Sequence, residues 1–541
     1  MTGMEKSDNV DKKNLLRLIK ISYKKLKAHV YYDKTMTVLR DKIVQFEREP
    51  ISRDENPNDV VENKLNMIAD NLMDDEKWIK FKSEILSTIS VLAYPKKIKR
   101  ATNDIIFNND DKCNISIEEY QYFINLSVEG HILGVLWILL VGRYLDNENN
   151  MYKHSYGNRL RKTLVDKNDE VTFFPNLFQP YFSQYENWRD KGLTVAKDCV
   201  RDGNDVVIIT MDFKRYYYSV DFQKEEFESF LTVADLKDEI CEKINRFVYN
   251  VICTYSKNFF EVMYVNDDEC FSEIKEGTNI LPIGFLPSNI LGNVRLNEFD
   301  KALVTRWNPV YYGRYVDDVI IVDKVDKFSN LYMSSNLESI NKEKVIDYYF
   351  GLCNADKKLC CEAGKELLKR YKKADSNEFI YYINEIYIGT NKKRKILVQN
   401  DKVKVFYFSA KSTDALITCF QNEIAINASG FKYMPEINAS SGMFGEYNHI
   451  IELSRNDTIN KFSAIKDVKI NKYEVSKLLG KWSTVSYLLG GKINNTSTKE
   501  FLKVFDKKNL ILNYNIWERI FELLVIEKDY ESYKNLYVNI L

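Results

Sequence analysis

A chain of 541 residues is longer than one ordinary hydrophobic core accommodates, so two to four domains are expected. Its composition, 45% hydrophobic and 29% charged, excludes a largely disordered protein. The 78 basic and 78 acidic residues give a formal net charge of zero, so a nucleic acid would have to be bound by local basic clusters rather than by a positive average.

The histidines and cysteines limit which kinds of metal site and catalytic site are expected. The four histidines and nine cysteines include no pair at zinc-ligand spacing, which argues against a zinc site and a histidine-based triad. Structural thiols in a reducing compartment are indicated instead. Residues 1–13 are polar and charged, and the longest apolar stretch, 132–142, is too short to span a bilayer. We expect a cytoplasmic protein without membrane contact.

The first 145 residues are expected to be mainly helical. Apolar residues recur at helical spacing across residues 14–71, and a further helix is predicted to continue through Leu92 until Pro95 ends the pattern. Residues 117–145 predict two helices, of which the second is apolar on all sides and therefore buried. The polar segment 148–170 predicts a loop.

The middle of the chain changes character at a β-branched run, residues 206–211, which predicts a buried strand that ends at Asp212. Residues 310–322 are rich in valine, isoleucine and tyrosine around Asp317 and Asp318, which predicts two short strands joined by a tight acidic turn. The other segments are predicted as a helix over 223–263, a loop entering a helix over 282–296, strands within 379–408, and helices after residue 409.

Three carboxylates follow from this pattern as candidate catalytic residues. A strand that ends in Asp212, beside a hairpin with Asp317 and Asp318 at its tip, would hold acidic side chains on rigid elements. Two Mg²⁺ ions held by such carboxylates catalyse in-line phosphoryl transfer. An acidic turn exposed to solvent is the ordinary alternative for the tetrapeptide 315–318 taken alone.

Three segments occur in the order found in reverse transcriptases. Residues 212–217 (DFKRYY) resemble their motif A, residues 281–293 (LPIGFLPSNILGN) resemble motif B, and residues 315–318 (YVDD) match motif C. Ile283 stands where glutamine is common, and Asn289 stands where proline is common. Both departures are more similar to the bacterial defence-associated enzymes of the abortive-infection and unknown-group types than to retroviral or group II intron enzymes.

This resemblance implies a fold and a metal site. The fold would be α+β: a right-hand polymerase with a ferredoxin-like palm and α-rich fingers over residues 1–405, and a helical C-terminal domain over residues 406–541. Two Mg²⁺ ions, for which Mn²⁺ can substitute, would be held by three carboxylates and one backbone carbonyl. These ligands are Asp212, Asp317, Asp318 and the carbonyl of Phe213.

The resemblance also implies a nucleotide site. Tyr217, five residues after Asp212, would pack under the sugar and exclude a 2′-hydroxyl; a core aromatic residue is the less favoured alternative. Arg159 would face the triphosphate, although an ordinary loop arginine is an equal alternative. The remaining candidates are Lys214, Arg215, Tyr216, Gly284, Ser288 and Lys357, of which Gly284 and Ser288 would shape the floor and Lys357 is equally a solvated lysine.

The function expected from the motifs is a reverse transcriptase that makes DNA from deoxynucleoside triphosphates in antiphage defence. Synthesis would be templated by RNA or be template-independent. An RNA template or a noncoding RNA and a DNA product are expected partners, and a homo-oligomer or a partner protein is left open. The alternatives are an RNA-dependent RNA polymerase, which Tyr217 disfavours, and a polymerase-derived scaffold that binds RNA or protein.

Overall fold

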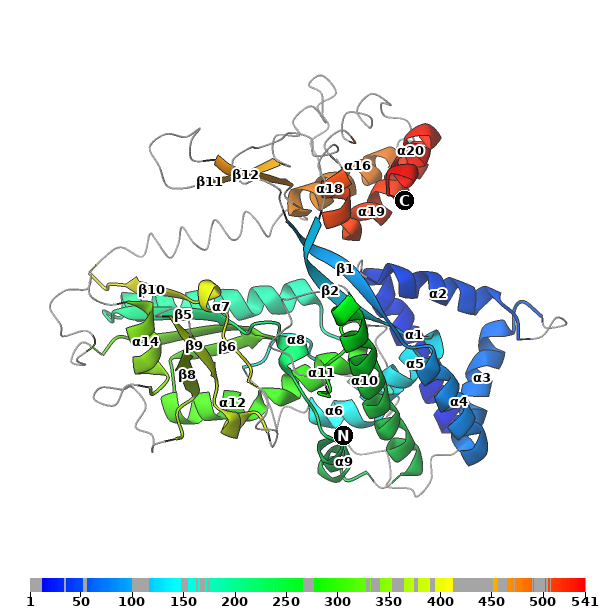
Figure 1. The fold of residues 1–541 in the computed structure, drawn as a ribbon, viewed down its shortest axis with the longest axis horizontal. Coiled ribbons are helices and arrows are strands. Elements are labelled where there is room, and N and C mark those ends of the chain that lie inside the picture. Colours follow the sequence, from blue (N-terminus) through cyan, green and yellow to red (C-terminus); the bar gives the residue numbers. More distant parts are fainter. Residues whose placement is uncertain are drawn as a thin grey trace. The chain divides into compact units, whose positions relative to one another are not determined.

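The computed structural model describes most of the chain as a mixed α+β protein, mostly helical with small antiparallel sheets (Figure 1). The expected α+β class is confirmed at this level. The described residues are 12–33, 36–51, 56–99, 116–146, 154–161, 164–165, 171–172, 176–236, 238–265, 277–326, 331, 341–352, 364–373, 378–389, 395–411, 451–455, 465–470, 472–488, 490, 502, 505 and 507–540.

The chain divides into two compact units. The first comprises residues 1–92, 123–267 and 271–421, and the second comprises residues 93–122, 268–270 and 422–541. The domain boundary expected after residue 405 stays a prediction. Strand β10 (Lys404–Phe408) crosses that position and pairs with a strand of the first unit.

A four-stranded antiparallel sheet organises part of the first unit, in the order β10-β5-β7-β6. It contains β5 (Val206–Asp212), β7 (Asp318–Lys324) and β6 (Tyr311–Tyr315). The β-branched run of β5 is almost wholly buried, as predicted, because the strand lies in the interior of the sheet between β10 and β7. The predicted hairpin is confirmed as well, since β6 and β7 pair across a turn of two residues.

Helix α7 (Tyr181–Arg201) covers one face of this sheet (Figure 1). Its buried side chains share a hydrophobic cluster with β5, β6, β7 and β10: Ala196, Cys199, Val200, Val206, Ile208, Tyr311, Val322 and Phe408. Gly192 allows the close approach, since a Cβ atom there would lie 3.0 Å from the ring of Tyr311. This cluster lies at the end of the sheet away from the acidic turn. At the turn end, Tyr181, Tyr185 and Trp188 of α7 contact the ring of Tyr315, the last residue of β6.

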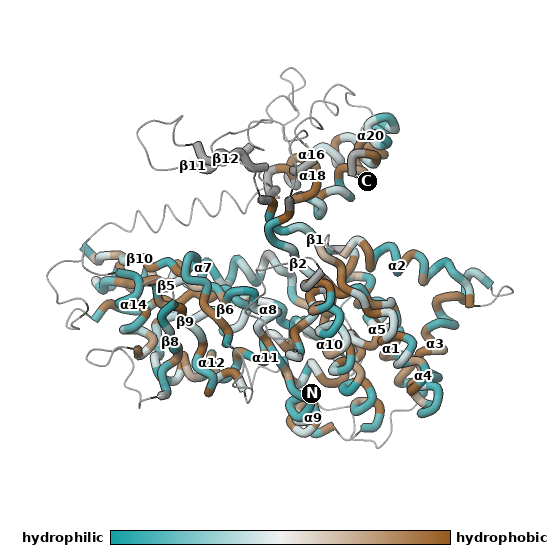
Figure 2. Tube along the Cα trace, viewed as in Figure 1, coloured by the Kyte–Doolittle hydropathy of each residue, from teal (hydrophilic) through white to brown (hydrophobic). Residues whose placement is uncertain are grey.

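Several helices of the first unit lie around α5 (Val128–Trp137), which continues through a π-helical turn (Ile138–Gly142) into α6 (Arg143–Leu145). By length and composition the 18 residues Val128–Leu145 could cross a membrane, so the apolar segment is longer than the sequence suggested. Because 78% of it is buried inside the structure, the predicted buried helix is confirmed, and Figure 2 shows most of α5 as hydrophobic. Helices α1 (Lys12–Tyr32), α2 (Thr37–Arg48) and α10 (Glu239–Val265) pack against α5. Helices α3 (Val60–Met73) and α4 (Asp75–Ser87) pack against each other, and α9 (Lys224–Val233) packs against α10.

Two helical predictions in the N-terminal part were wrong. The helix expected to reach Leu92 ends at Ser87, and Pro95 lies inside strand β1 (Ser90–Lys99). The first helix expected within 117–145 is strand β2 (Ser116–Asn125), which pairs with β1. In a two-stranded ribbon both strands are edges, so proline is tolerated there, and aromatic side chains suit the pleat.

The second unit contains the helices expected after residue 409 together with a hairpin. Its hydrophobic core surrounds Trp482, whose indole N–H donates to Glu527 at 3.2 Å. Its main elements are β11 (Ile451–Arg455), β12 (Ile465–Ile470), α16 (Lys472–Leu488), α18 (Lys507–Leu512), α19 (Trp517–Ile526) and α20 (Tyr530–Ile540). Other elements of the first unit are β3 (Leu164–Val165), β4 (Val171–Thr172), α8 (Tyr216–Ser219), α11 (Leu286–Arg295), α12 (Asn297–Ala302), α14 (Lys342–Tyr349), β8 (Leu368–Lys372) and β9 (Phe379–Ile383).

Candidate metal and nucleotide site

The sheet brings the three predicted carboxylates to one end of neighbouring strands. Asp212, the last residue of β5, lies directly opposite Asp318, the first residue of β7. Asp317 occupies the turn that joins β6 to β7. Because side chains of paired residues in an antiparallel sheet are neighbours, this register places acidic groups from two distant parts of the chain side by side.

Burial and neighbouring charges shift the pKa values of the two carboxyls at the turn. Burial, with the charges of Asp212 and Asp318, raises the pKa of Asp317 to about 7. Burial and the charge of Asp212 raise the pKa of Asp318 to about 6. Carboxyl groups that lie too close together to be ionised at the same time without a cost are typical of sites that bind a cation or transfer protons.

Lys402 is the cation that sequence reasoning missed. Its ammonium group forms an ion pair with Oδ2 of Asp212, although the two residues are 190 positions apart. Burial opposes the lysine charge, but the bond to Asp212 and the other two carboxylates outweigh it and raise the pKa of Lys402. The lysine lies in an ordinary polar segment just before β10, so no local pattern marks it.

The donor set suits a hard divalent cation. Oδ1 of Asp212 is buried and has no hydrogen-bond partner among the described residues, so it can accept a ligand. Mg²⁺ takes oxygen ligands, often one or two carboxylates supplemented by water and substrate phosphates. Within the described part of the chain, no three or more His, Cys, Asp or Glu side chains are gathered tightly enough to hold an ion by themselves. Phe213, the other predicted ligand, forms a β-bridge with Val398 next to Asp212.

A buried polar network fixes the acidic turn from behind. Val316, in the turn, has a φ of 57°, which is costly for a β-branched residue. Arg314 holds its carbonyl oxygen at 2.6 Å. The same guanidinium is fully buried, pairs with Asp300 at 2.7 Å and donates to Asn293 at 3.0 Å. The amide of Asn293 donates in turn to the carbonyl of Gly157 at 2.9 Å.

The tyrosines after Asp212 take different positions. Tyr216 is buried and donates to the carbonyl of Gly292, so it belongs to the core. Tyr217 is partly exposed, and the nearby charge of Asp317 adds to burial in raising its pKa. Lys214 bonds through its N–H to the carbonyl of Leu397 at 2.8 Å. Arg215 has a φ of 50° at the start of α8, and both basic side chains are partly exposed.

Gly284 and Ser288 lie at the entrance to α11. Gly284 has a φ of 90°, a conformation that favours glycine, and follows Ile283, which bridges to Phe123. Ser288 is 1% exposed, and its hydroxyl has no hydrogen-bond partner among the described residues. An unpaired buried hydroxyl is unusual and leaves a polar group to be satisfied on this helix.

Two other nucleotide candidates are not brought into the site by the described contacts. Arg159 donates through Nε to Asp146 at 2.7 Å and through Nη1 to the carbonyl of Ser155 at 3.1 Å. These bonds fit the loop-arginine alternative, because they tie the guanidinium to Asp146 of the adjoining segment and to a nearby backbone carbonyl. Lys357 lies outside the described residues.

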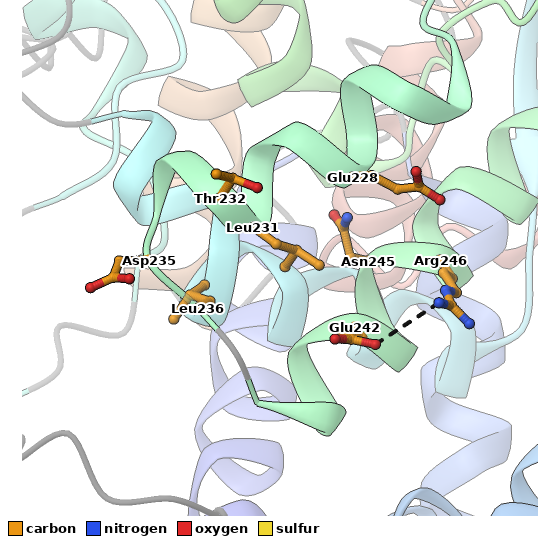
Figure 3. A pocket seen from close by; sticks show the side chains of 8 residues that line it. All are labelled: Glu228, Leu231, Thr232, Asp235, Leu236, Glu242, Asn245 and Arg246. Atoms are coloured by element: carbon orange, nitrogen blue, oxygen red, sulfur yellow. Dashed lines mark ion pairs between the residues drawn. The ribbon is translucent and has the colours of Figure 1, made fainter.

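A separate pocket of about 360 Å³ lies between α9 and α10 (Figure 3). It is lined by Glu228, Leu231, Thr232, Asp235, Leu236, Glu242, Asn245 and Arg246. Arg246 and Glu242 form an ion pair of 3.9 Å across one end of it. None of the predicted site residues lines this pocket, so it is not the site that the motifs indicate.

Comparison with known proteins adds no family assignment. No protein-family model matches the chain, and no curated protein matches it. What the protein does is therefore inferred from its own residues: an acidic strand end, an acidic turn and a neighbouring tyrosine.

Proposed function

We propose that this protein is a reverse transcriptase, a DNA polymerase that uses two metal ions. The observation that carries the proposal is the register of β5 and β7, which pairs Asp212 with Asp318 and sets Asp317 beside them. The proposed fold is a right-hand polymerase. The four-stranded sheet with α7 would be a ferredoxin-like palm, the N-terminal helices would be the fingers, and a helical domain would follow.

The proposed mechanism assigns the metal ligands to three acidic residues. Asp212 and Asp317 would hold the two ions, Asp318 would be a weaker ligand, and the backbone carbonyl of Phe213 would complete the set. Bound Mg²⁺ supplies charge that stabilises the attacking and leaving oxygens of the phosphoryl transfer. The raised pKa values of Asp317 and Asp318 support this assignment, because a divalent cation would relieve their repulsion.

Substrate selection is assigned to residues beside the carboxylates. Tyr217 forms a wall that a 2′-hydroxyl would meet, which favours deoxynucleotides. Gly284 and Ser288 shape the floor under the template and nucleotide, and Lys214 and Arg215 supply positive charge near the triphosphate. Arg159 and Lys357 stay weaker candidates, since the first is paired with Asp146.

The biological role rests on the resemblance to bacterial defence enzymes. We infer synthesis of DNA, templated by RNA or template-independent, in antiphage defence and in the cytoplasm. An RNA template or noncoding RNA and a DNA product are the proposed nucleic-acid partners, and a homo-oligomer or a partner protein stays open.

One alternative has its own supporting observation. The ion pair between Lys402 and Asp212 and the lack of a tight three-carboxylate group among the described residues fit a polymerase-derived scaffold that binds RNA or protein. Such a protein would keep the acidic residues without using them.

The test compares synthesis by purified wild-type protein and by the Asp317→Ala–Asp318→Ala variant. Each is supplied with Mg²⁺ and labelled deoxynucleotides, with and without an RNA template and primer. Product made by the wild type and lost in the variant supports the polymerase. The control is Asp401→Ala, an exposed acidic residue next to Lys402, which should keep full activity. Equal silence of wild type and variant with every template, with the variant still active in cells, would establish the scaffold instead.

A further inference from the structure

The hydroxyl group of Tyr217 is held between two asparagine side chains. It donates to Oδ1 of Asn289 at 3.0 Å and accepts from Nδ2 of Asn158 at 3.2 Å. Both distances lie within the normal range, and together they use the donor and one acceptor position of the phenol. The ring is therefore fixed at its far end as well as at its backbone.

The two asparagines come from parts of the chain that are themselves fixed. Asn289 lies in the first turns of α11, next to the buried Ser288. Asn158 has a φ of 55°, a conformation that asparagine tolerates better than most residues. The preceding Gly157 is buried, and a Cβ atom there would come within 2.8 Å of the backbone nitrogen of Val316, in the acidic turn.

This arrangement has a consequence for sugar selection. A tyrosine wall rejects a ribose only if the ring cannot rotate to another staggered position. The hydroxyl that could otherwise form a compensating bond with a 2′-hydroxyl is already engaged by Asn158 and Asn289. A ribose would then meet both a steric conflict and an unpaired polar group, which is how sites discriminate against near-identical ligands.

We propose that Asn158 and Asn289 determine sugar specificity by holding the Tyr217 ring in place against ribonucleotides. This inference rests on the proposed polymerase function. It also gives a physical role to Asn289, the departure from the usual motif B, because proline at that position could not accept the hydrogen bond. The ligand distinguished is the ribose or deoxyribose of an incoming nucleoside triphosphate.

The experiment measures kcat/KM for a deoxynucleotide and for the matching ribonucleotide. The selectivity is the deoxynucleotide value divided by the ribonucleotide value, and this is the ratio compared between variants. Tyr217→Ala should reduce this ratio on the order of a hundredfold, because the wall is gone. Asn158→Gly, which keeps the backbone conformation accessible, and Asn289→Ala should each reduce it by about threefold to tenfold. In the two asparagine variants, deoxynucleotide kcat/KM should change less than about threefold, in line with a loss of selectivity rather than of folding.

Tyr217→Phe provides the internal check. It keeps the ring and removes the hydroxyl, so it should match the Asn158→Gly–Asn289→Ala double variant, and adding the asparagine changes to Tyr217→Phe should have no further effect. The matched control is Asn308→Gly, an exposed asparagine with a φ of 53° before β6, which should leave the ratio unchanged.

The outcomes separate this inference from the proposed function. If the wild type synthesises DNA and Tyr217→Ala lowers the ratio while the double asparagine variant does not, the asparagines do not hold the ring and the inference is overturned. If Tyr217→Ala leaves the ratio unchanged, Tyr217 is not the selecting residue, and the inference falls while the polymerase stands. If the wild type makes no product with any nucleotide, the proposed function fails and the inference fails with it.

Discussion

Two charged clusters lie only three residues apart on the β6–β7 hairpin, and they are built in opposite ways. At Arg314 the guanidinium is fully buried, and its Nε, Nη1 and Nη2 atoms all donate hydrogen bonds, chiefly to Asp300. At the turn, Asp317 and Asp318 lie beside Asp212, with the exposed Lys402 as a counter-charge.

The difference indicates what each cluster is for. Burying a charge is tolerable when it is paired and bonded, which the Arg314 cluster achieves and which fixes the Val316 carbonyl. Leaving carboxylates crowded costs folding free energy, because their pKa values rise above that of an exposed aspartate. The Arg314 cluster is fully paired, whereas the carboxylates of the turn carry more negative charge than their neighbours balance. This contrast is consistent with a site that a cation completes, where function and stability oppose each other.

The largest expected effect comes from breaking the paired cluster. Arg314→Leu leaves the carboxylate of Asp300 buried without its partner, so the free energy of unfolding should fall by about 3–5 kcal/mol. Urea-induced unfolding, followed by circular dichroism, measures it. The matched control is Lys301→Ala, which removes the exposed ion pair with Glu298 on the same helix and should cost less than about 1 kcal/mol. Equal losses in both variants would contradict the contrast between the clusters.

The opposite effect is expected at the acidic turn. In EDTA, Asp317→Asn should raise the free energy of unfolding by about 1–2 kcal/mol at about pH 8; the modest figure allows for partial exposure of the side chain. The folded pKa is about 7 and the ordinary value is 3.8, so the cost of this carboxyl grows as pH rises from about 4 to 7 and is complete above 7.

The dependence of this stability gain on pH checks that prediction. The gain from Asp317→Asn should fall to about a quarter of its pH 8 value at about pH 4.5, where the folded carboxyl is protonated although the unfolded one is still mostly ionised. Denaturant unfolding of wild type and variant at the two pH values gives both numbers. If Asp317→Asn is no more stable than the wild type at about pH 8, or if its gain in stability is as large at about pH 4.5, crowding of negative charge is not the source of the gain.

The smallest effect is expected at the counter-charge. Lys402→Met should lower the free energy of unfolding in EDTA by less than about 1 kcal/mol, because the lysine side chain is 55% exposed. It should also tighten binding of Mn²⁺ severalfold, since the lysine competes for Asp212. Isothermal titration of Mn²⁺ measures this, with Lys404→Met, an exposed lysine on β10, as the control. If Lys402→Met binds Mn²⁺ more weakly than the wild type while Lys404→Met does not, the lysine contributes to ion binding and does not compete with it.

The parts of the fold that the sequence predicted are those with strong local patterns. The β-branched run before Asp212 is long enough to identify a buried strand, and glycine and proline before α11 mark a loop that enters a helix. The acidic residues within a valine- and tyrosine-rich segment similarly identified the hairpin. Each of these depends on neighbours in the chain.

The parts that were missed depend on distant partners. The segment that forms β2 has aromatic and apolar residues compatible with a helix, and only pairing with β1, across residues 100–115, decides for a strand. The ion pair of Lys402 with Asp212 joins residues 190 positions apart, and Arg159 pairs with Asp146 from an adjoining segment. Tertiary contacts of this kind leave no periodicity in a single sequence.

Thermal unfolding of wild type and Asp317→Asn, each in EDTA and in millimolar Mg²⁺ or Mn²⁺, tests the central claim most directly. A cation that completes the acidic cluster binds the folded state, so the wild-type Tm should rise with metal concentration. The variant should start higher in EDTA and gain little or nothing from metal. A wild-type Tm that is the same in EDTA and in both metals, with a variant that is no more stable, would contradict a metal site at Asp212, Asp317 and Asp318.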